Sequence, residues 1–151
     1  MKLKSLVAVA AIVVGISAAQ AHDGEFSAGR PGDPKKPART VTVTMHDDAN
    51  GMHYVPDRID VKRGEQVRIV IENKGVLKHE FTLATMQDNK KHGALMMKFP
   101  DMEHDDPNAK SVEPGKSTEI LWHFDKSGTF EFACLIPGHY EAGMHGTASV
   151  K

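Results

Sequence analysis

A cysteine, a histidine and a methionine stand at equal intervals near the end of the chain, at Cys134, His139 and Met144. Thiolate, imidazole and thioether groups are soft or borderline ligands, a set that suits copper changing between Cu(I) and Cu(II) and suits zinc or magnesium poorly. A trigonal copper site takes two histidines, one cysteine and a weak axial methionine. This segment therefore lacks only one histidine of such a site.

We expect the missing histidine at position 79, because side chains alternate between the two faces of a β-strand. Cys134 ends one expected strand on the face that carries Phe132. His79 stands at the end of another expected strand, on the face that carries Phe81. Two inward-pointing side chains at strand ends can converge on one pole of a sandwich, so His79 is the candidate for the remaining ligand.

These residues allow other interpretations. Cys134 and His139 could form a thiol nucleophile with its base, but thiol hydrolases usually present the cysteine at a helix start rather than at a strand end. Covalent haem attachment needs C-x-x-C-H, which the sequence lacks. Taken singly, Cys134 could be an inert buried thiol, His79 a hydrogen-bonded core histidine and Met144 a core methionine.

Residues 1–21 have the features of a secretory signal peptide. They combine a basic start, an apolar run from Leu6 to Ile16, and small residues before Ala21 that fit a cleavage site. Cleavage there would make His22 the first residue of the mature chain. The apolar run is too short to span a bilayer, so we expect a soluble periplasmic protein without stable membrane insertion.

The charge balance argues against a nucleic-acid partner. Residues 1–21 hold two of the 19 basic residues and none of the 20 acidic ones, so the mature chain has a formal charge of −3. A mildly acidic domain without a basic stripe repels phosphate backbones.

A single cysteine in an oxidising compartment forms no internal disulfide, which leaves Cys134 in need of another role.

Residues 22–39 are rich in Gly, Pro and charge, and we expect a flexible arm there. Residues 40–151 form the expected single domain. In it, apolar and polar residues alternate as half-buried strands require, at Val41–Met45, Val67–Ile71, Phe81–Leu83, Ile120–Phe124, Phe130–Phe132 and Ala148–Val150. Turn residues separate these runs, which predicts an all-β antiparallel sandwich or barrel.

One stretch between Ala84 and Ser111 interrupts the strand pattern. Residues 90–99 predict a short helix capped by Asp88, with Leu95, Met96 and Phe99 on the face that packs against the sandwich.

From about Val41 onward the chain resembles the cupredoxins, which include azurin, plastocyanin, rusticyanin and auracyanin. The resemblance is carried by residues 78–81 (KHEF), by the 134–144 loop and by the final GTASV run, and the loop spacing looks most like that of rusticyanin and auracyanin. It implies a Greek-key β-sandwich that holds one copper ion per chain. It also implies that Cys134 supplies a thiolate, His79 and His139 supply imidazole nitrogens, and Met144 is the long axial ligand.

Two features depart from azurin and plastocyanin. Glu80 stands where those proteins have an asparagine that braces the ligand loops, so the reduction potential and colour of the site do not carry over. The arm and the 101–107 insertion look more similar to periplasmic cupredoxin-like proteins associated with copper tolerance.

These observations lead to two functional hypotheses. The first is a non-enzymatic, monomeric carrier of single electrons between periplasmic redox partners. The second is copper tolerance, in which the protein sequesters copper or delivers it to exchange partners through additional soft ligands. The candidates for such secondary sites are His22, Met45, His46, Met52, His53, Met86, His92, Met96, Met97, Met102 and His104.

Ordinary packing and a solvated terminus are the competing interpretations for Met96, Met97 and His22. A copper oxidase or nitrite reductase is a third hypothesis. Such enzymes need further copper centres from a second domain or a subunit interface, so we expect no enzymatic activity.

Overall fold

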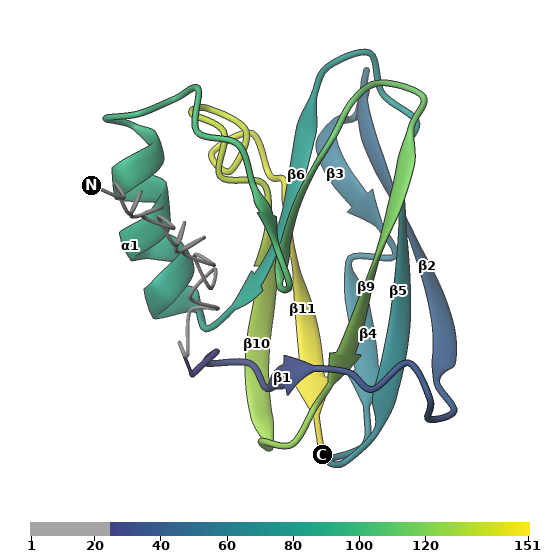
Figure 1. Ribbon diagram of the computed structural model, residues 1–151. Helices are drawn as coiled ribbons and strands as arrows, with labels where there is room; N and C mark the ends of the chain where they lie inside the picture. The colour runs from purple at the N-terminus through teal and green to yellow at the C-terminus, as the bar shows by residue number, and fades with distance from the viewer. Residues whose placement is uncertain (1–24) are drawn as a thin grey trace, which may run out of the picture.

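Alternating apolar residues build two β-sheets packed face to face, seen in the computed structural model, which describes residues 25–151 (Figure 1). The first sheet contains, in spatial order, β1 (Arg30–Pro31), β9 (Ser117–His123), β5 (Gln66–Asn73), β2 (Arg39–Asp48) and β3 (Gly51–Val55). The second contains β4 (Arg58–Val61), β11 (His145–Val150), β10 (Gly128–Ala133), β6 (His79–Ala84), β8 (Ala109–Val112) and β7 (Asp105–Asp106). The predicted all-β sandwich is confirmed.

The strand pairing is mixed rather than purely antiparallel. β2 pairs in parallel with β5, and β4 pairs in parallel with β11. Both parallel pairs arise because the chain leaves the β2–β3 hairpin, crosses to the second sheet for β4 and returns to the first sheet for β5. The strands β1, β3, β4, β7 and β8 were not expected from the sequence, because each spans five residues or fewer, which is too short for a pattern of alternation to stand out.

Aromatic side chains fill the space between the sheets beneath one end of the sandwich. Phe81 and Phe132 stack with ring centroids 5.1 Å apart, and Tyr54 meets both rings edge-on. Phe81 lies two residues after His79, and Phe132 lies two residues before Cys134. Aromatic packing of this kind contributes about 0.5–1.5 kcal/mol per pair beyond area burial, so it fixes the two strand ends that carry these residues.

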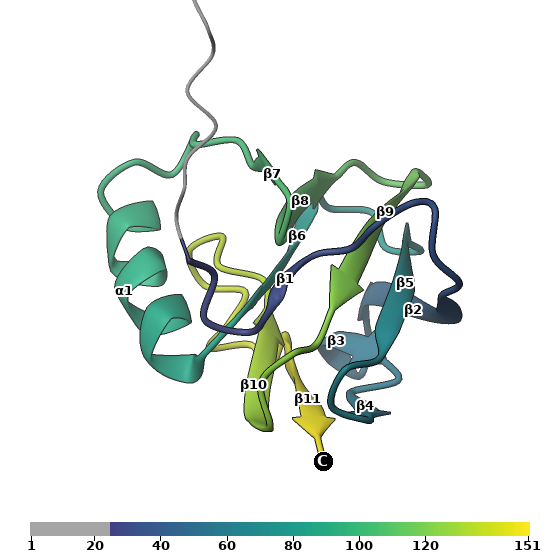
Figure 2. The ribbon, with the colours of Figure 1, turned by 60° about the horizontal axis from the view of Figure 1, so that its bottom comes forward.

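Residues 25–39 are packed on the first sheet, which differs from the flexible arm expected for residues 22–39. β1 pairs with β9 (Figure 2), and the Phe26 ring meets the Trp122 ring edge-on at 5.3 Å. The Trp122 indole donates a hydrogen bond to the Ala28 carbonyl oxygen at 3.0 Å. The segment has few apolar residues, but it covers a fully buried tryptophan and supplies the acceptor that its N–H needs. The predicted signal peptide, residues 1–21, lies outside the described residues.

The contact between Phe26 and Trp122 gives a testable prediction. Replacing Phe26 with alanine is expected to lower the free energy of unfolding by about 1–3 kcal/mol, because Phe26 is only partly buried. Urea denaturation followed by the fluorescence of Trp122, the single tryptophan, measures the change. Phe99→Ala is the matched control, since Phe99 is 62% exposed. Equal effects of the two substitutions would contradict the packing role of residues 25–39.

The helix α1 (Met86–Met96), the only one within residues 25–151, begins four residues earlier than expected. Its N-cap is Thr85, whose hydroxyl accepts the Asp88 amide at 3.2 Å and donates to the Asp88 carboxylate at 2.8 Å, so Asp88 lies inside the first turn. The helix lies against β6 and β10 (Figure 1). Of the face expected to pack, only Met96 is buried, whereas Leu95 and Phe99 are exposed. No helix within residues 25–151 is long and apolar enough to cross a membrane.

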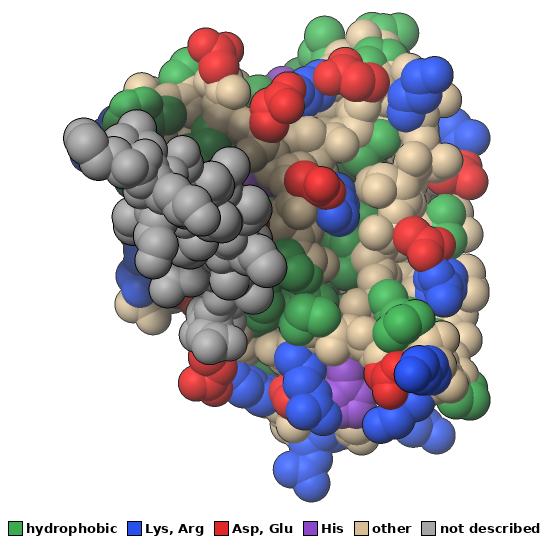
Figure 3. Space-filling view, in the orientation of Figure 1, with side chains coloured by type: hydrophobic (Ala, Val, Ile, Leu, Met, Phe, Trp, Pro, Cys, Tyr) green, Lys and Arg blue, Asp and Glu red, His purple; other side chains and the backbone are tan. Residues whose placement is uncertain are grey.

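The face of the molecule in Figure 3 carries acidic and basic side chains interspersed with one another. Among the side chains that the structure describes, no stripe of a single sign runs across this face. Ion pairs also join neighbouring elements of the structure, including Arg39 with Glu65 and Arg68 with Glu119.

Candidate metal centre

The sandwich brings three of the four predicted ligands together at the end opposite the C-terminus (Figure 1). His79 is the first residue of β6, and Cys134 directly follows β10, which pairs with β6. His139 lies in the loop that joins β10 to β11. One ligand atom from each of these three residues lies within 4.8 Å of the other two. The alternation of side chains along a strand predicted that His79 points into the sandwich, and the structure places it beside Cys134 and His139.

The donor atoms of these residues share one small volume. His79 Nδ1 lies 3.2 Å from His139 Nδ1, and Cys134 Sγ lies 3.3 Å from His139 Nδ1. Cys134 and His79 are fully buried, whereas His139 is partly exposed. The centre is therefore closed on the side of the sandwich and approached from solvent past His139.

Met144 lies directly before β11 and is fully buried in the same core cluster as Cys134. Backbone hydrogen bonds close the ligand loop: the Cys134 amide donates to the Met144 carbonyl at 3.0 Å, and the Met144 amide donates to the His139 carbonyl at 3.1 Å. Gly138 has φ +89°, a conformation that favours glycine at this turn. These bonds hold the cysteine, the histidine and the methionine in a fixed relation.

Asp47, at the inner face of β2, orients His79. Its carboxylate Oδ2 lies 2.8 Å from His79 Nε2 and accepts the Leu77 amide at 2.8 Å, and its Oδ1 accepts the Val76 amide at 2.8 Å. Burial opposes the charge, but these donors keep the pKa of Asp47 below its usual value. The carboxylate therefore accepts a hydrogen bond from the Nε2–H group of His79, which leaves Nδ1 with its lone pair toward Cys134 and His139.

Burial sets the protonation of the three converging side chains. It raises the pKa of the Cys134 thiol to about 12, although amides of Glu80 and Ile136 oppose the shift. Burial also lowers the pKa of His79 and of His139, so both imidazoles are neutral at pH 7. A neutral imidazole is ready to bind a metal, whereas the thiol must lose its proton to the incoming cation.

The residues fit a copper ion by their chemistry. Two imidazole nitrogens and a cysteine sulfur converge, and a buried methionine belongs to the same loop, which is the donor set of a trigonal copper centre with a weak axial thioether. The Glu80 amide lies 3.3 Å from Cys134 Sγ and donates to it, which would stabilise a bound thiolate.

Glu80, the residue after His79, has its side chain turned toward the 101–107 insertion. Its carboxylate Oε1 accepts the Ser111 hydroxyl at 3.4 Å and lies 3.9 Å from His104 Nε2. Burial raises the pKa of Glu80 above its usual value. The Tyr54 hydroxyl donates to the Glu80 carbonyl oxygen, so the main chain beside His79 is anchored from the core.

The secondary candidates separate into two clusters and several isolated residues. His92 Nε2 lies 3.0 Å from His104 Nε2, which in turn lies 3.3 Å from Met96 Sδ. In the second cluster, His46 and His53 stack at 5.1 Å and, with Asp48, offer ligand atoms within 4.8 Å of one another.

The remaining candidates do not gather around a common point. Met45 is buried in the core and Met52 packs against it. Met86 and Met97 are exposed, and Met102 packs against the small cluster of Met96, Ala133 and Leu135. His22 lies outside the described residues.

Two partner residues were missed from the sequence. Asp47 continues the inward series of Val43 and Met45, so an acidic residue on the core face of β2 was the available signal. Asp48, on the opposite face, had no such signal because exposed acidic residues are common.

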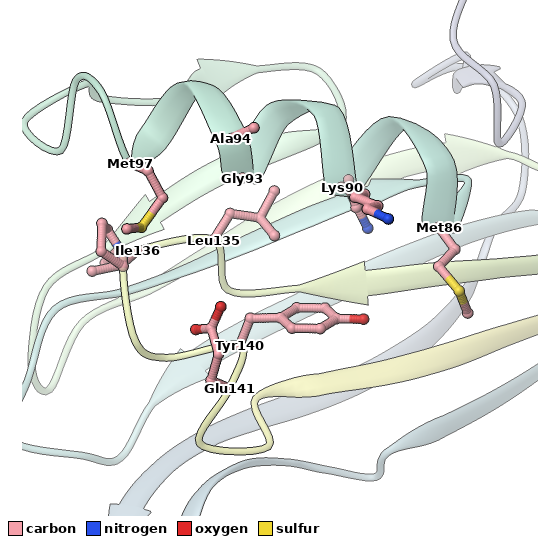
Figure 4. A pocket seen from close by; sticks show the side chains of 11 residues that line it. Met86, Lys90, Gly93, Ala94, Met97, Leu135, Ile136, Tyr140 and Glu141 are labelled. Atoms are coloured by element: carbon pink, nitrogen blue, oxygen red, sulfur yellow. The ribbon is translucent and has the colours of Figure 1, made fainter.

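An apolar hollow adjoins the ligand loop. A cavity of about 370 Å³ lies between α1 and residues 135–141 (Figure 4). Met97 extends from α1 toward Ile136, and Leu135 and Tyr140 also line the loop side. The surface next to His139 is therefore concave and largely apolar.

Comparison with known proteins agrees with this architecture. The sequence model of the cupredoxin-like domain matches residues 6–147. The chain is 51% identical over 133 residues to the copper-resistant cuproprotein CopI of Rubrivivax gelatinosus, which covers 88% of this chain and 79% of that protein. It is 34% identical to the CopI of Pseudomonas aeruginosa, with 98% of each chain covered.

The solved structure of auracyanin B superposes with a TM-score of 0.65 over 82% of this chain and 96% of that chain, at 24% identity, which is a likeness of fold. The resemblance expected from the KHEF stretch and the 134–144 loop is thereby confirmed, and the chain belongs to the cupredoxin-like family.

Proposed function

We propose that this protein holds one copper ion through His79, Cys134 and His139, with Met144 as the axial ligand, and that it serves copper tolerance in the periplasm. The observation that carries the proposal is the convergence of His79 Nδ1, Cys134 Sγ and His139 Nδ1 in a mostly buried pole. It is supported by the 51% identity to a copper-resistant cuproprotein.

Bound copper supplies one-electron chemistry between Cu(I) and Cu(II). To bind copper, the Cys134 thiol would lose its proton and become a thiolate. The hydrogen bond from the Glu80 amide would stabilise the negative charge on that sulfur. Asp47 holds His79 in one tautomer. Because the loop is closed by backbone bonds, the ligands need little rearrangement between the two oxidation states, a condition that favours single-electron transfer.

His139 is the proposed contact point for partners. It is the partly exposed ligand, and its loop borders the apolar cavity under α1 (Figure 4). A concave apolar surface suits a transient protein contact. We expect a redox or copper-exchange protein to dock there, and no nucleic acid.

The proposal is tested with protein isolated from the periplasm. We expect an N-terminus at His22, at least one copper per chain and a visible copper-thiolate absorption band. Expression of the chain in a copper-sensitive bacterium is expected to raise the copper concentration at which growth stops. Absence of the band from copper-loaded protein would refute the ligand assignment, and an unchanged growth limit would refute the role in tolerance.

A second candidate function, sequestration of Cu(I), is favoured by the His92–Met96–His104 cluster. Two imidazoles and one thioether converge there, with Met96 fully buried and His104 nearly so. Soft thioether and borderline imidazole ligands suit Cu(I). Burial, followed by the proximity of His104, lowers the pKa of His92, which keeps this imidazole neutral and available.

This cluster predicts that Met96→Leu weakens Cu(I) binding beyond the first equivalent by about 10-fold or more. Leucine preserves the volume of the side chain and removes the sulfur, so the fold is retained. Competition with a coloured Cu(I) chelator measures the affinity. Met97→Leu is the matched control, since Met97 is 67% exposed and lies outside the cluster. Equal Cu(I) affinities for the two variants would remove the sequestration argument.

We further propose that the protein is not an enzyme. Turnover assays with nitrite and with oxygen test this directly. Steady turnover by the purified copper-loaded chain would contradict it.

A further inference from the structure

The β2–β3 hairpin carries a second group of ligands on the outer face of the first sheet. His46 and His53 are directly opposite in the antiparallel register, and Asp48 is opposite Gly51. Side chains of directly opposed residues lie about 4.5–5.5 Å apart at their Cβ atoms, within reach of one ion. The two imidazole rings are nearly parallel at 12°, and the three residues offer ligand atoms within 4.8 Å of one another.

The hydrogen bonds on this face determine which nitrogen of each imidazole carries the proton when the ring is neutral. The Thr44 hydroxyl donates its only proton to the Val55 carbonyl at 3.2 Å, so it accepts from His46 Nε2 at 2.9 Å. The Gly51 carbonyl can only accept, so His53 Nδ1 donates to it at 3.2 Å. His46 Nδ1 and His53 Nε2 therefore keep lone pairs. Such outer hydrogen bonds fix the tautomers of metal-binding histidines.

Asp48 completes the group with a carboxylate. One of its oxygens, Oδ1, accepts the Asn50 amide at 2.8 Å, and Asp48 forms no ion pair within residues 25–151. β3 is the edge strand of its sheet, and Asp48 is exposed while both histidines are half-buried. An ion can reach the three side chains directly from solvent.

From this geometry we propose that His46, His53 and Asp48 form a surface site for a borderline divalent cation, with Cu(II) bound more tightly than Zn(II). The nearby sulfur atoms do not contribute, because Met45 and Met52 lie on the other face of the hairpin and pack on the core. Two imidazoles and one carboxylate suit Cu(II), Ni(II) and Zn(II), and the order of stability among these metals places Cu(II) first.

The site lies at the rim of the copper centre but is separate from it. Asp47, between His46 and Asp48 in the chain, points to the inner face and contacts His79. The hairpin also abuts the ligand loop, since a Cβ placed on Gly51 would lie 3.5 Å from the Ala142 carbonyl oxygen. Variants of the outer site must therefore be checked for an intact main centre.

The experiment uses the processed full chain with Cu(I) in the main centre, titrated with Zn(II) while the imidazole resonances are followed by NMR. We expect the His46 and His53 resonances to shift together and to reach saturation at a common Zn(II) concentration. Cu(II) added afterwards is expected to displace Zn(II) and broaden these resonances.

His46→Gln should weaken the Zn(II) response of His53 by about 10-fold or more, and Asp48→Asn should weaken both responses. His123→Gln, on β9 and outside both clusters, is the matched control and should leave them unchanged. An unchanged visible band of each oxidised copper-loaded variant verifies the main centre. If His53 keeps its Zn(II) affinity in His46→Gln, or if neither histidine responds while Zn(II) binds elsewhere, the site does not exist.

Discussion

Replacing Cys134 with serine is expected to abolish the copper-thiolate absorption band and to weaken copper retention at the main centre by roughly two orders of magnitude or more. The serine hydroxyl is a hard, weakly acidic group that cannot replace a thiolate as a ligand for copper. Cys134 is fully buried, and its sulfur lies 3.3 Å from both the Glu80 amide and His139 Nδ1, so no neighbouring side chain can substitute for it.

The measurement combines a visible spectrum with a copper count after dialysis against a chelator. Ala133→Ser is the matched control, because Ala133 is an equally buried neighbour whose side chain packs against Met96 and Leu135 instead. It introduces the same hydroxyl without removing a ligand, and it should keep the band. A Cys134→Ser protein that retains both the band and the copper would show that the centre lies elsewhere.

Asp47→Asn is expected to weaken copper binding at the main centre by about 10- to 100-fold. Asparagine offers one acceptor oxygen where the carboxylate offers two. At the Oδ2 position this oxygen would accept the Leu77 amide and His79 Nε2, but the NH₂ group would then face the Val76 amide at the Oδ1 position. In the flipped orientation the NH₂ group would face both the Leu77 amide and His79 Nε2. Either orientation sets a donor against a donor and removes the negative charge that holds the proton on Nε2, so the tautomer of His79 is no longer fixed while the shape of the side chain is preserved.

Copper affinity by chelator competition and the position of the visible band are the two readouts for Asp47→Asn. A purely structural role would lower the free energy of unfolding without moving the band of the copper-loaded protein. Asp48→Asn, one residue further along β2 on the opposite face, should leave the affinity and band of the main centre as in the wild type. If Asp47→Asn and the wild type bind copper with equal affinity, Asp47 does not position His79 for the metal.

Local patterns in the sequence accounted for most of the strands and for three members of the site. Cys134, His139 and Met144 lie in one loop, so their proximity follows from chain connectivity. His79 was reached through strand parity, which works because successive side chains of a strand alternate between a buried and an open face. The assignment of these residues as copper ligands stays a prediction, while their convergence is observed for His79, Cys134 and His139.

The sequence by itself thus determined the fold class, the short helix and the composition of a soft-ligand loop, because alternation, turn residues and spacing act over a few residues. Only the tertiary structure decided that Asp47 orients His79 across 32 positions, that residues 25–39 cover Trp122, and that His92, Met96 and His104 meet beside Glu80. These contacts depend on which strands become neighbours and on where the insertion folds back. The strand neighbours and the position of the insertion are determined by the packing of the whole chain, so they cannot be predicted from short stretches of sequence.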